Sequence, residues 1–179
     1  MSSTLHISSR VQALVKKYQT ADPFALCRAL HIRVHYTDLG PSMKAYYFYQ
    51  SRIKTIVLNT RCSDTVQKVL CAHELGHAIL HSNLANMYGF HETALLDRSV
   101  PTEYEANLFA AELLVPDKTL FAFFGEPDKT FYDIACELSI PPELLDFKFR
   151  ILNHKGYHLE APCTARSNFL KNNPPNSFQ

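Results

Sequence analysis

The stretch Cys71–His81, "CAHELGHAILH", places two histidines four residues apart with a glutamate directly after the first. On a helix each residue advances about 100°, so His73 and His77 lie about 40° apart on one face and one turn apart along the axis. Both imidazoles can therefore reach one metal ion. Glu74 lies about 60° beyond His77 on the same side, where it suits a general base better than a ligand. The stretch predicts a helix that carries a metal site.

The residues around the motif favour this helix. Ser63 or Asp64 can cap its N-terminus, and apolar residues recur at helical spacing up to about residue 82. Several apolar residues cluster on the face opposite the histidines, so one side packs and the other carries chemistry. Cys71 is assigned to the packed side and not to a nucleophile's role. Gly76, between the histidines, permits close approach of another element.

A catalytic zinc site normally has three protein ligands, and the motif supplies two. His81 is eight residues from His73, about 12 Å along a helix, while zinc–nitrogen bonds are about 2.0 to 2.1 Å, so one ion cannot hold both. His81 is therefore expected to pack or to form a hydrogen bond. Leu80 and Asn83 stand where the HExxHxxGxxH pattern has its glycine and third histidine, which excludes the metzincin type.

Residues 100–116, "VPTEYEANLFAAELLVP", predict a second helix that can supply the third ligand. Glu103 and Asn107 are four residues apart and share a face with small apolar residues that can pack on the motif helix. Glu103 is the favoured ligand, with Glu105 as the alternative. Asn107 is expected to bind a ligand histidine in support. Glu105 lies about 200° from Glu103, nearer the solvent side with Glu112.

The rest of the chain predicts an α+β fold. Helices at about 8–19 and 22–30 precede three strands, mostly antiparallel, and residues 83–100 read as a long irregular segment. The predicted strands and the later helices are 31–37, 44–50 and 54–60, then 117–124, 129–138 and 142–153. We expect one domain over 1–158, with 117–158 as its C-terminal helical part. Residues 159–179 are expected to form a partly disordered tail.

Composition excludes several classes of protein. The 179 residues are 46% hydrophobic and 20% charged, which suits one domain with a substantial core. The net charge of +1 offers no footprint for nucleic acid or an anionic membrane. The chain shows neither a signal-peptide pattern nor an apolar run near 18 residues, and its five cysteines form no CxxC pair. A cytoplasmic protein with reduced thiols is expected.

Two motifs together resemble the ImmA/IrrE family of metallopeptidases. "AHELGHAILH" is followed by "EYEANLFAAELLVP", and the family pattern is HELGHxxxH and then E-x-x-A-N-x-F-A-x-x-L-L-x-P. The resemblance covers about residues 22–116. It implies a minimal zincin-like domain with His73, His77 and Glu103 as zinc ligands and Glu74 as the catalytic glutamate. Because the C-terminal part is short, we expect this chain to differ from family members that carry an appended sensor domain.

The resemblance also implies a reaction and a partner. Members of the family often cleave a helix-turn-helix repressor encoded beside them, which releases a mobile element, such as a phage, or a stress response. The expected activity is thus zinc-dependent, site-specific hydrolysis of a peptide bond in a cytosolic regulator. Glu74 would accept a proton from water and carry it to the leaving amine. Tyr88, His91 and Tyr104 remain open as donors to the oxyanion.

Two other interpretations stay open. Residues 131–152, "FYDIACELSIPPELLDFKFRIL", have a helix, turn, helix cadence, which would suit a non-enzymatic DNA-binding or repressor-binding regulator built on a zincin scaffold. Acidic residues offset the basic ones in this segment, which disfavours contact with DNA. The other interpretation is an inactive zincin that only binds its partner, and the presence of Glu74 argues against it.

Overall fold

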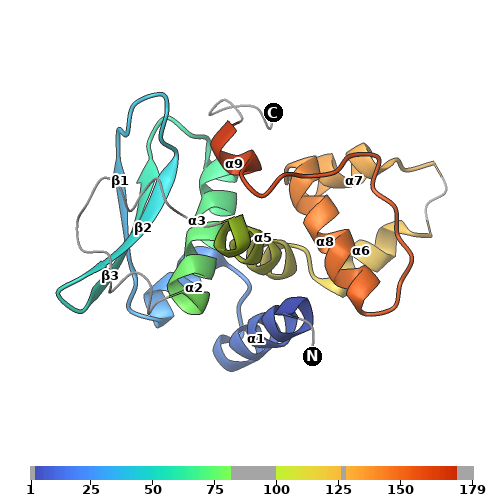
Figure 1. Cartoon of the computed structure of the whole chain (residues 1–179), viewed down its shortest axis with the longest axis horizontal. Helices are drawn as coiled ribbons and strands as arrows, with labels where there is room; N and C mark the ends of the chain where they lie inside the picture. Colours follow the sequence, from blue (N-terminus) through green and yellow to red (C-terminus); the bar gives the residue numbers. More distant parts are fainter. Residues whose placement is uncertain (1–2, 82–99, 126–127, 173–179) are drawn as a thin grey trace.

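The computed structural model describes residues 3–81, 100–125 and 128–172 and has the expected α+β fold (Figure 1). The predicted irregular segment at 83–100 lies almost wholly outside the described residues. The elements follow one another along the chain as α1 (Ser3–Tyr18), α2 (Pro23–Ala29), β1 (Arg33–Thr37), β2 (Ala45–Gln50), β3 (Ile53–Asn59), α3 (Asp64–Leu80), α5 (Val100–Leu114), α6 (Asp117–Phe123), α7 (Phe131–Glu137), α8 (Pro142–His154) and α9 (Phe169–Asn172).

The sheet is mixed, with strand order β1-β3-β2. β2 and β3 pair antiparallel across a tight turn at Ser51 and Arg52, whose φ angles of 51° and 65° are those of a two-residue hairpin turn. β1 pairs parallel with β3. The prediction of a mostly antiparallel sheet is therefore corrected. The chain does reverse at each connection, but β1 lies beside β3 and not beside β2, so one of the two pairings is parallel.

The motif helix α3 is central, with the sheet on one side and α5 on the other (Figure 1). The backbones of α3 and α5 touch at Gly76: a Cβ atom placed there would lie 3.1 Å from Ala106 Cα and 3.1 Å from Phe109 Cβ. The close approach predicted for Gly76 is thus confirmed. Cys71 and Leu75 are fully buried, so the packed face of α3 is also as predicted.

Side-chain caps define where several helices begin. The carboxylate of Asp22 accepts hydrogen bonds from the backbone of Phe24 and Ala25, and Ser63 accepts one from Val66, so the predicted cap at Ser63 is confirmed. At α7, Thr130 and Asp133 form a reciprocal capping box. These caps satisfy backbone N–H groups that the first turn of a helix leaves without partners.

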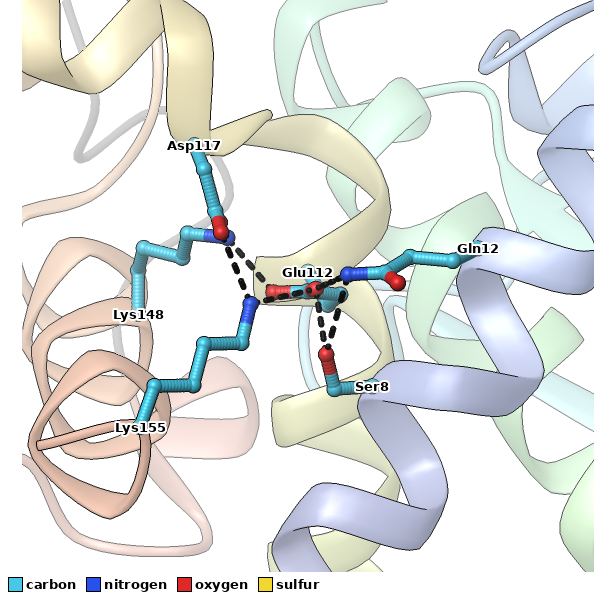
Figure 2. A network of polar contacts seen from close by, with 6 residues as sticks. All are labelled: Ser8, Gln12, Glu112, Asp117, Lys148 and Lys155. Atoms are coloured by element: carbon cyan, nitrogen blue, oxygen red, sulfur yellow. Dashed lines mark hydrogen bonds and ion pairs between the residues drawn. The ribbon is translucent and has the colours of Figure 1, made fainter.

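A buried ion network joins α1, α5, α6 and α8 near the end of α5 (Figure 2). Glu112 accepts a hydrogen bond from Ser8 Oγ at 2.6 Å and ion-pairs with Lys148 Nζ at 2.5 Å and Lys155 Nζ at 3.1 Å. Asp117 binds the same two lysines, at 2.5 and 2.8 Å. The sequence placed Glu112 nearer the solvent, and this is wrong, because α1 and α8 cover it and leave it 6% exposed.

The network also sets the protonation of its acids. Burial alone would raise the pKa of Glu112, but the charge and hydrogen bond of Lys148, with help from Ser8 and Lys155, hold it below its ordinary value. Burial likewise opposes ionisation of Asp117, and hydrogen bonds from Lys148 and Lys155 lower its pKa. Both carboxylates are therefore stabilised as anions by positive charge that the chain itself supplies.

The C-terminal segment returns to the body of the protein. Asn107 Nδ2 on α5 donates to the carbonyl of Ser167 at 2.7 Å, and Ala165, Phe169 and Leu170 are buried. The short helix α9 was not predicted from sequence. The division into a domain at 1–158 and a tail stays a prediction. Among the described residues, no helix combines the length and apolar character needed to cross a membrane.

Candidate metal centre

Three side chains converge between α3 and α5: His73 and His77 from α3 and Glu103 from the first turn of α5. The Nε2 atoms of the two histidines are 3.1 Å apart. Glu103 Oε2 lies 3.4 Å from His73 Nε2, and Glu103 Oε1 lies 3.6 Å from His77 Nε2. All three residues are at most 5% exposed. The structure thus brings together the three residues that the sequence singled out as ligands.

The local fold explains this convergence. The four-residue step along α3 places the imidazoles one turn apart, with ring centroids at 4.8 Å and planes at 79°. The backbone contact at Gly76 then lets α5 approach closely enough for Glu103, three residues before Ala106, to reach both rings. A side chain at position 76 would push α5 away from the histidines.

The cluster fits a zinc ion by its chemistry and its spacing. Atoms bound tetrahedrally at about 2.1 Å from a metal lie about 3.4 Å from one another, close to the spacing of the Nε2 and carboxylate atoms here. Two imidazoles and one carboxylate are a donor set of catalytic zinc sites, which leaves a position open for water. The buried acceptors converge on a point where a cation would satisfy them together.

The next residue along α3 is Glu74, which is also buried, at 3% exposed. Its backbone position, directly after His73, is the one from which a general base can act on water at such a centre. Asn107 does not show the predicted contact: within the described residues its amide donates to Ser167, and its buried Oδ1 has no hydrogen-bond partner.

His81 and Glu105 form a second layer that the sequence did not predict as a unit. His81 Nδ1 lies 3.2 Å from His77 Nδ1, and His81 Nε2 lies 2.9 Å from Glu105 Oε2. His81 thus forms hydrogen bonds, as expected, while Glu105, the alternative ligand, reaches His81 and is not one of the three clustered residues. The signal in the sequence was a second four-residue step, from His77 to His81.

Comparison with known proteins tests the family. Residues 27–150 match the model of the IrrE N-terminal-like domain, Peptidase_M78. The chain belongs to this family. The resemblance predicted from the two motifs is therefore confirmed, and with it the enzyme class, a metallopeptidase.

Two relatives of this IrrE-like chain come from Bacillus and one of its phages. The "Uncharacterized immunity region protein 2" of Bacillus phage phi105 is 37% identical over 142 residues, which cover 79% of this chain and 88% of the relative. "Metallopeptidase ImmA" of Bacillus subtilis (strain 168) is 27% identical over 145 residues, covering 79% of this chain and 83% of the relative. The similarity thus extends over most of each protein.

Of the three candidate oxyanion donors, only Tyr104 is among the described residues of this IrrE-like chain. Its ring packs edge-on against Phe147 of α8, with centroids 5.5 Å apart. The guanidinium carbon of Arg150 lies 5.8 Å from the same ring centroid. These contacts direct Tyr104 toward α8. Tyr88 and His91 lie outside the described residues.

Proposed function

We propose that this IrrE-like chain is a zinc-dependent, site-specific endopeptidase that cleaves a cytosolic helix-turn-helix repressor of a mobile element. The observation that carries the proposal is the buried convergence of His73, His77 and Glu103, with Glu74 next to it on α3. The names of the two relatives support the setting, since one is an immunity region protein of a phage and the other a metallopeptidase.

In this proposal each residue has a distinct task. His73, His77 and Glu103 hold the metal, and zinc, when bound, supplies Lewis acidity toward water and the peptide carbonyl. Glu74 accepts the proton of the attacking water and delivers it to the nitrogen of the leaving amine. The surrounding burial keeps bulk water from competing with these contacts, which strengthens electrostatic interactions at the centre.

The sheet offers a way to hold an extended substrate. β2 lies at an edge of the sheet and packs against α3, the helix that carries both histidines. An edge strand can pair with an added peptide strand through its main chain, and such pairing gives affinity with little preference for sequence. The scissile segment should therefore be a flexible or locally unfolded linker of the repressor, since only such a segment can adopt the extended form.

The contacts of α8 argue against the DNA-binding alternative. Lys148 is completely buried and paired with Glu112, and Arg150 pairs with Asp146 at 2.6 Å. α8 also buries its apolar residues against the rest of the protein. A recognition helix must instead present free basic and polar side chains to the groove.

The first test is Glu74→Gln. The amide is nearly isosteric but cannot accept the proton, so we expect zinc content and fold to be retained while cleavage of a repressor falls by about 10²- to 10⁴-fold. The matched control is Glu160→Gln, an exposed glutamate on the C-terminal segment, which should cleave like wild type. Turnover of the Glu74 variant near the wild-type rate would remove Glu74 from the mechanism.

The second test concerns the substrate. Cleavage of a helix-turn-helix repressor encoded beside the gene is compared with cleavage of unfolded casein at equal concentration. Preferential cleavage of the repressor at one site is expected. Efficient digestion of casein without preference for the repressor would contradict site specificity and indicate a general peptidase.

A further inference from the structure

A row of hydrogen bonds leads away from the metal cluster. It runs from His77 Nδ1 to His81 Nδ1 at 3.2 Å and from His81 Nε2 to Glu105 Oε2 at 2.9 Å. Ser3 of α1 donates to the other carboxylate oxygen of Glu105 at 2.9 Å. We call His77, His81 and Glu105 the histidine relay. It links three elements, because His81 caps the C-terminus of α3, Glu105 lies on α5 and Ser3 on α1.

The protons of the relay can be assigned from its acceptors. An ionised carboxylate only accepts, so Glu105 takes the Nε2–H of His81. A neutral imidazole has one N–H, so His81 then presents a bare Nδ1, which accepts the Nδ1–H of His77. The Nε2 of His77 is left with its lone pair toward the cluster, as a metal ligand requires. The opposite assignment would place the His77 proton on Nε2, where it would block the metal.

The two proposed ligand histidines differ in the hydrogen bonding of their Nδ1 atoms. Within the described residues the buried Nδ1 of His73 has no hydrogen-bond partner, whereas the Nδ1 of His77 is engaged by His81. His81 is itself held in place: its backbone N–H bonds to the His77 carbonyl, and its side chain is only 11% exposed. The chain therefore holds the ring of His77 at Nδ1, the nitrogen that does not face the cluster.

We propose that His81 and Glu105 are positioning residues for the metal centre, which fix the tautomer and ring orientation of His77. The inference rests on the metal site of the proposed function. Its effect should be on metal affinity, since partners of ligand histidines typically contribute about 10- to 100-fold. A purely structural role, in which His81 and Glu105 only fasten the end of α3 to α5, would instead appear in the stability of the metal-free protein.

The experiment compares His81→Leu, His81→Gln and Glu105→Gln with wild type. Zinc affinity is measured by competition with a chromophoric chelator, the visible spectrum by cobalt substitution, and stability by denaturant unfolding of the metal-free proteins. His81→Leu should bind zinc about 10- to 100-fold more weakly and show an altered cobalt spectrum at saturation. His81→Gln should recover most of the affinity, because its amide oxygen can accept from His77 while its amide nitrogen donates to Glu105.

Two control variants accompany these. Ser3→Ala removes the hydrogen bond from Ser3 to Glu105 but leaves the relay intact, and His154→Leu removes an exposed histidine of α8 that contacts the Arg150 carbonyl. Both should bind zinc as wild type does. Glu105→Gln should weaken binding less than His81→Leu, because the Gln oxygen can still accept from His81 but without a charge.

The outcomes separate the inference from the proposed function. Wild-type zinc affinity in His81→Leu would overturn the relay, and so would an affinity loss in His81→Gln as large as in His81→Leu. Graded affinity in these variants of a protein that cleaves no peptide would support the relay and refute the peptidase proposal. A wild-type chain that binds no zinc would overturn both.

Discussion

The two ends of α5 each carry a buried glutamate, and the chain treats them differently. Near its end, Glu112 is surrounded by Lys148, Lys155 and Ser8, so its charge is neutralised from within the chain (Figure 2). Near its start, Glu103 faces the Nε2 atoms of two histidines, which are neutral bases when they act as ligands. The ion network pairs its charges within the chain, whereas the proposed metal of the other cluster would come from outside the chain. In this protein a buried carboxylate therefore indicates a functional site only where the groups around it are acceptors, as at Glu103, and not cations, as at Glu112.

The largest expected effect comes from breaking the ion network. Lys148→Met leaves the buried Glu112 and the partly exposed Asp117 with Lys155 as the lysine that still pairs with both. Loss of one member of a buried pair, here Lys148 with Glu112, costs about 3 to 5 kcal/mol of unfolding free energy. Denaturant unfolding of the metal-free protein measures this. Arg61→Met is the matched control, because Arg61 pairs with Asp38 in a solvent-exposed bridge, and exposed ion pairs contribute little to stability.

If Lys148→Met lowered the unfolding free energy by less than Arg61→Met does, the structural role given to the network would be contradicted. The double variant Lys148→Met with Glu112→Leu sharpens the result. It removes both charges, so we expect it to be more stable than Lys148→Met alone.

The next effect concerns the other end of α5. Zinc at about 100 times its dissociation constant should add about 2.7 kcal/mol to the unfolding free energy, because only the folded chain brings the three ligands together. Glu103→Ala should abolish this increment, and Glu105→Ala should retain part of it. Calorimetric unfolding of each variant with and without zinc measures this increment. An increment that survives Glu103→Ala would exclude Glu103 as a ligand.

A smaller effect is expected where α3 and α5 touch. In Gly76→Ala the new methyl group lies 3.1 to 3.2 Å from backbone atoms of Ala106. Backbone atoms cannot move away by a change of rotamer, as a side chain could. Overpacking costs about 1 to 3 kcal/mol and the gain in helix propensity offsets up to about 1 kcal/mol. Net destabilisation of about 1 kcal/mol and weaker zinc binding should follow. A more stable variant with unchanged zinc affinity would show that the contact is not tight.

The smallest effect is in the dependence of stability on pH. The folded pKa values of Glu112 and Asp117 lie below their ordinary values, so in acid the unfolded chain binds more protons than the folded one. The stability contributed by these two carboxylates is complete above the unfolded pKa values, near 4 to 4.5, and is lost as the pH falls through the folded ones. Unfolding of the metal-free protein from pH 6 to 3 should show this decline.

The matched comparison is Lys155→Met, which removes one of the two lysines that lower these pKa values. Its stability should decline less steeply with falling pH than that of wild type. Equal slopes would show that Lys155 does not influence the titration of the network.

The sequence predicted the metal cluster because its geometry is mostly local. His73 and His77 are one turn apart on a single helix, and the pattern of small residues around Ala106 indicated which face of α5 packs on it. The parallel pairing of β1 with β3 was missed, because short connections predict the direction of successive strands but not which strands become neighbours.

The ion network and the relay were missed for a related reason. In the sequence Lys148 is one of several basic residues offset by acidic ones, without a specific partner. Glu112 was placed toward the solvent, because a single helix does not reveal that α1 and α8 will cover that side of α5. The distance between His81 and His73 excludes His81 as a ligand, but His81 also stands four residues after His77, a spacing that brings these two rings together. Contacts between distant elements depend on topology, which one sequence leaves open.

The contacts of α1 and of the C-terminal segment extend beyond both ends of the family match. The family match spans residues 27–150, yet Ser8 reaches Glu112 from α1, Ser3 reaches Glu105, and Ser167 receives the amide of Asn107 from beyond the other boundary. Lys155, half of the counter-charge of the network, also lies outside the match. The family match is thus shorter than the part of the chain that these contacts join. A chain trimmed to residues 27–150 should unfold with lower cooperativity than the full chain, even though every proposed metal ligand remains.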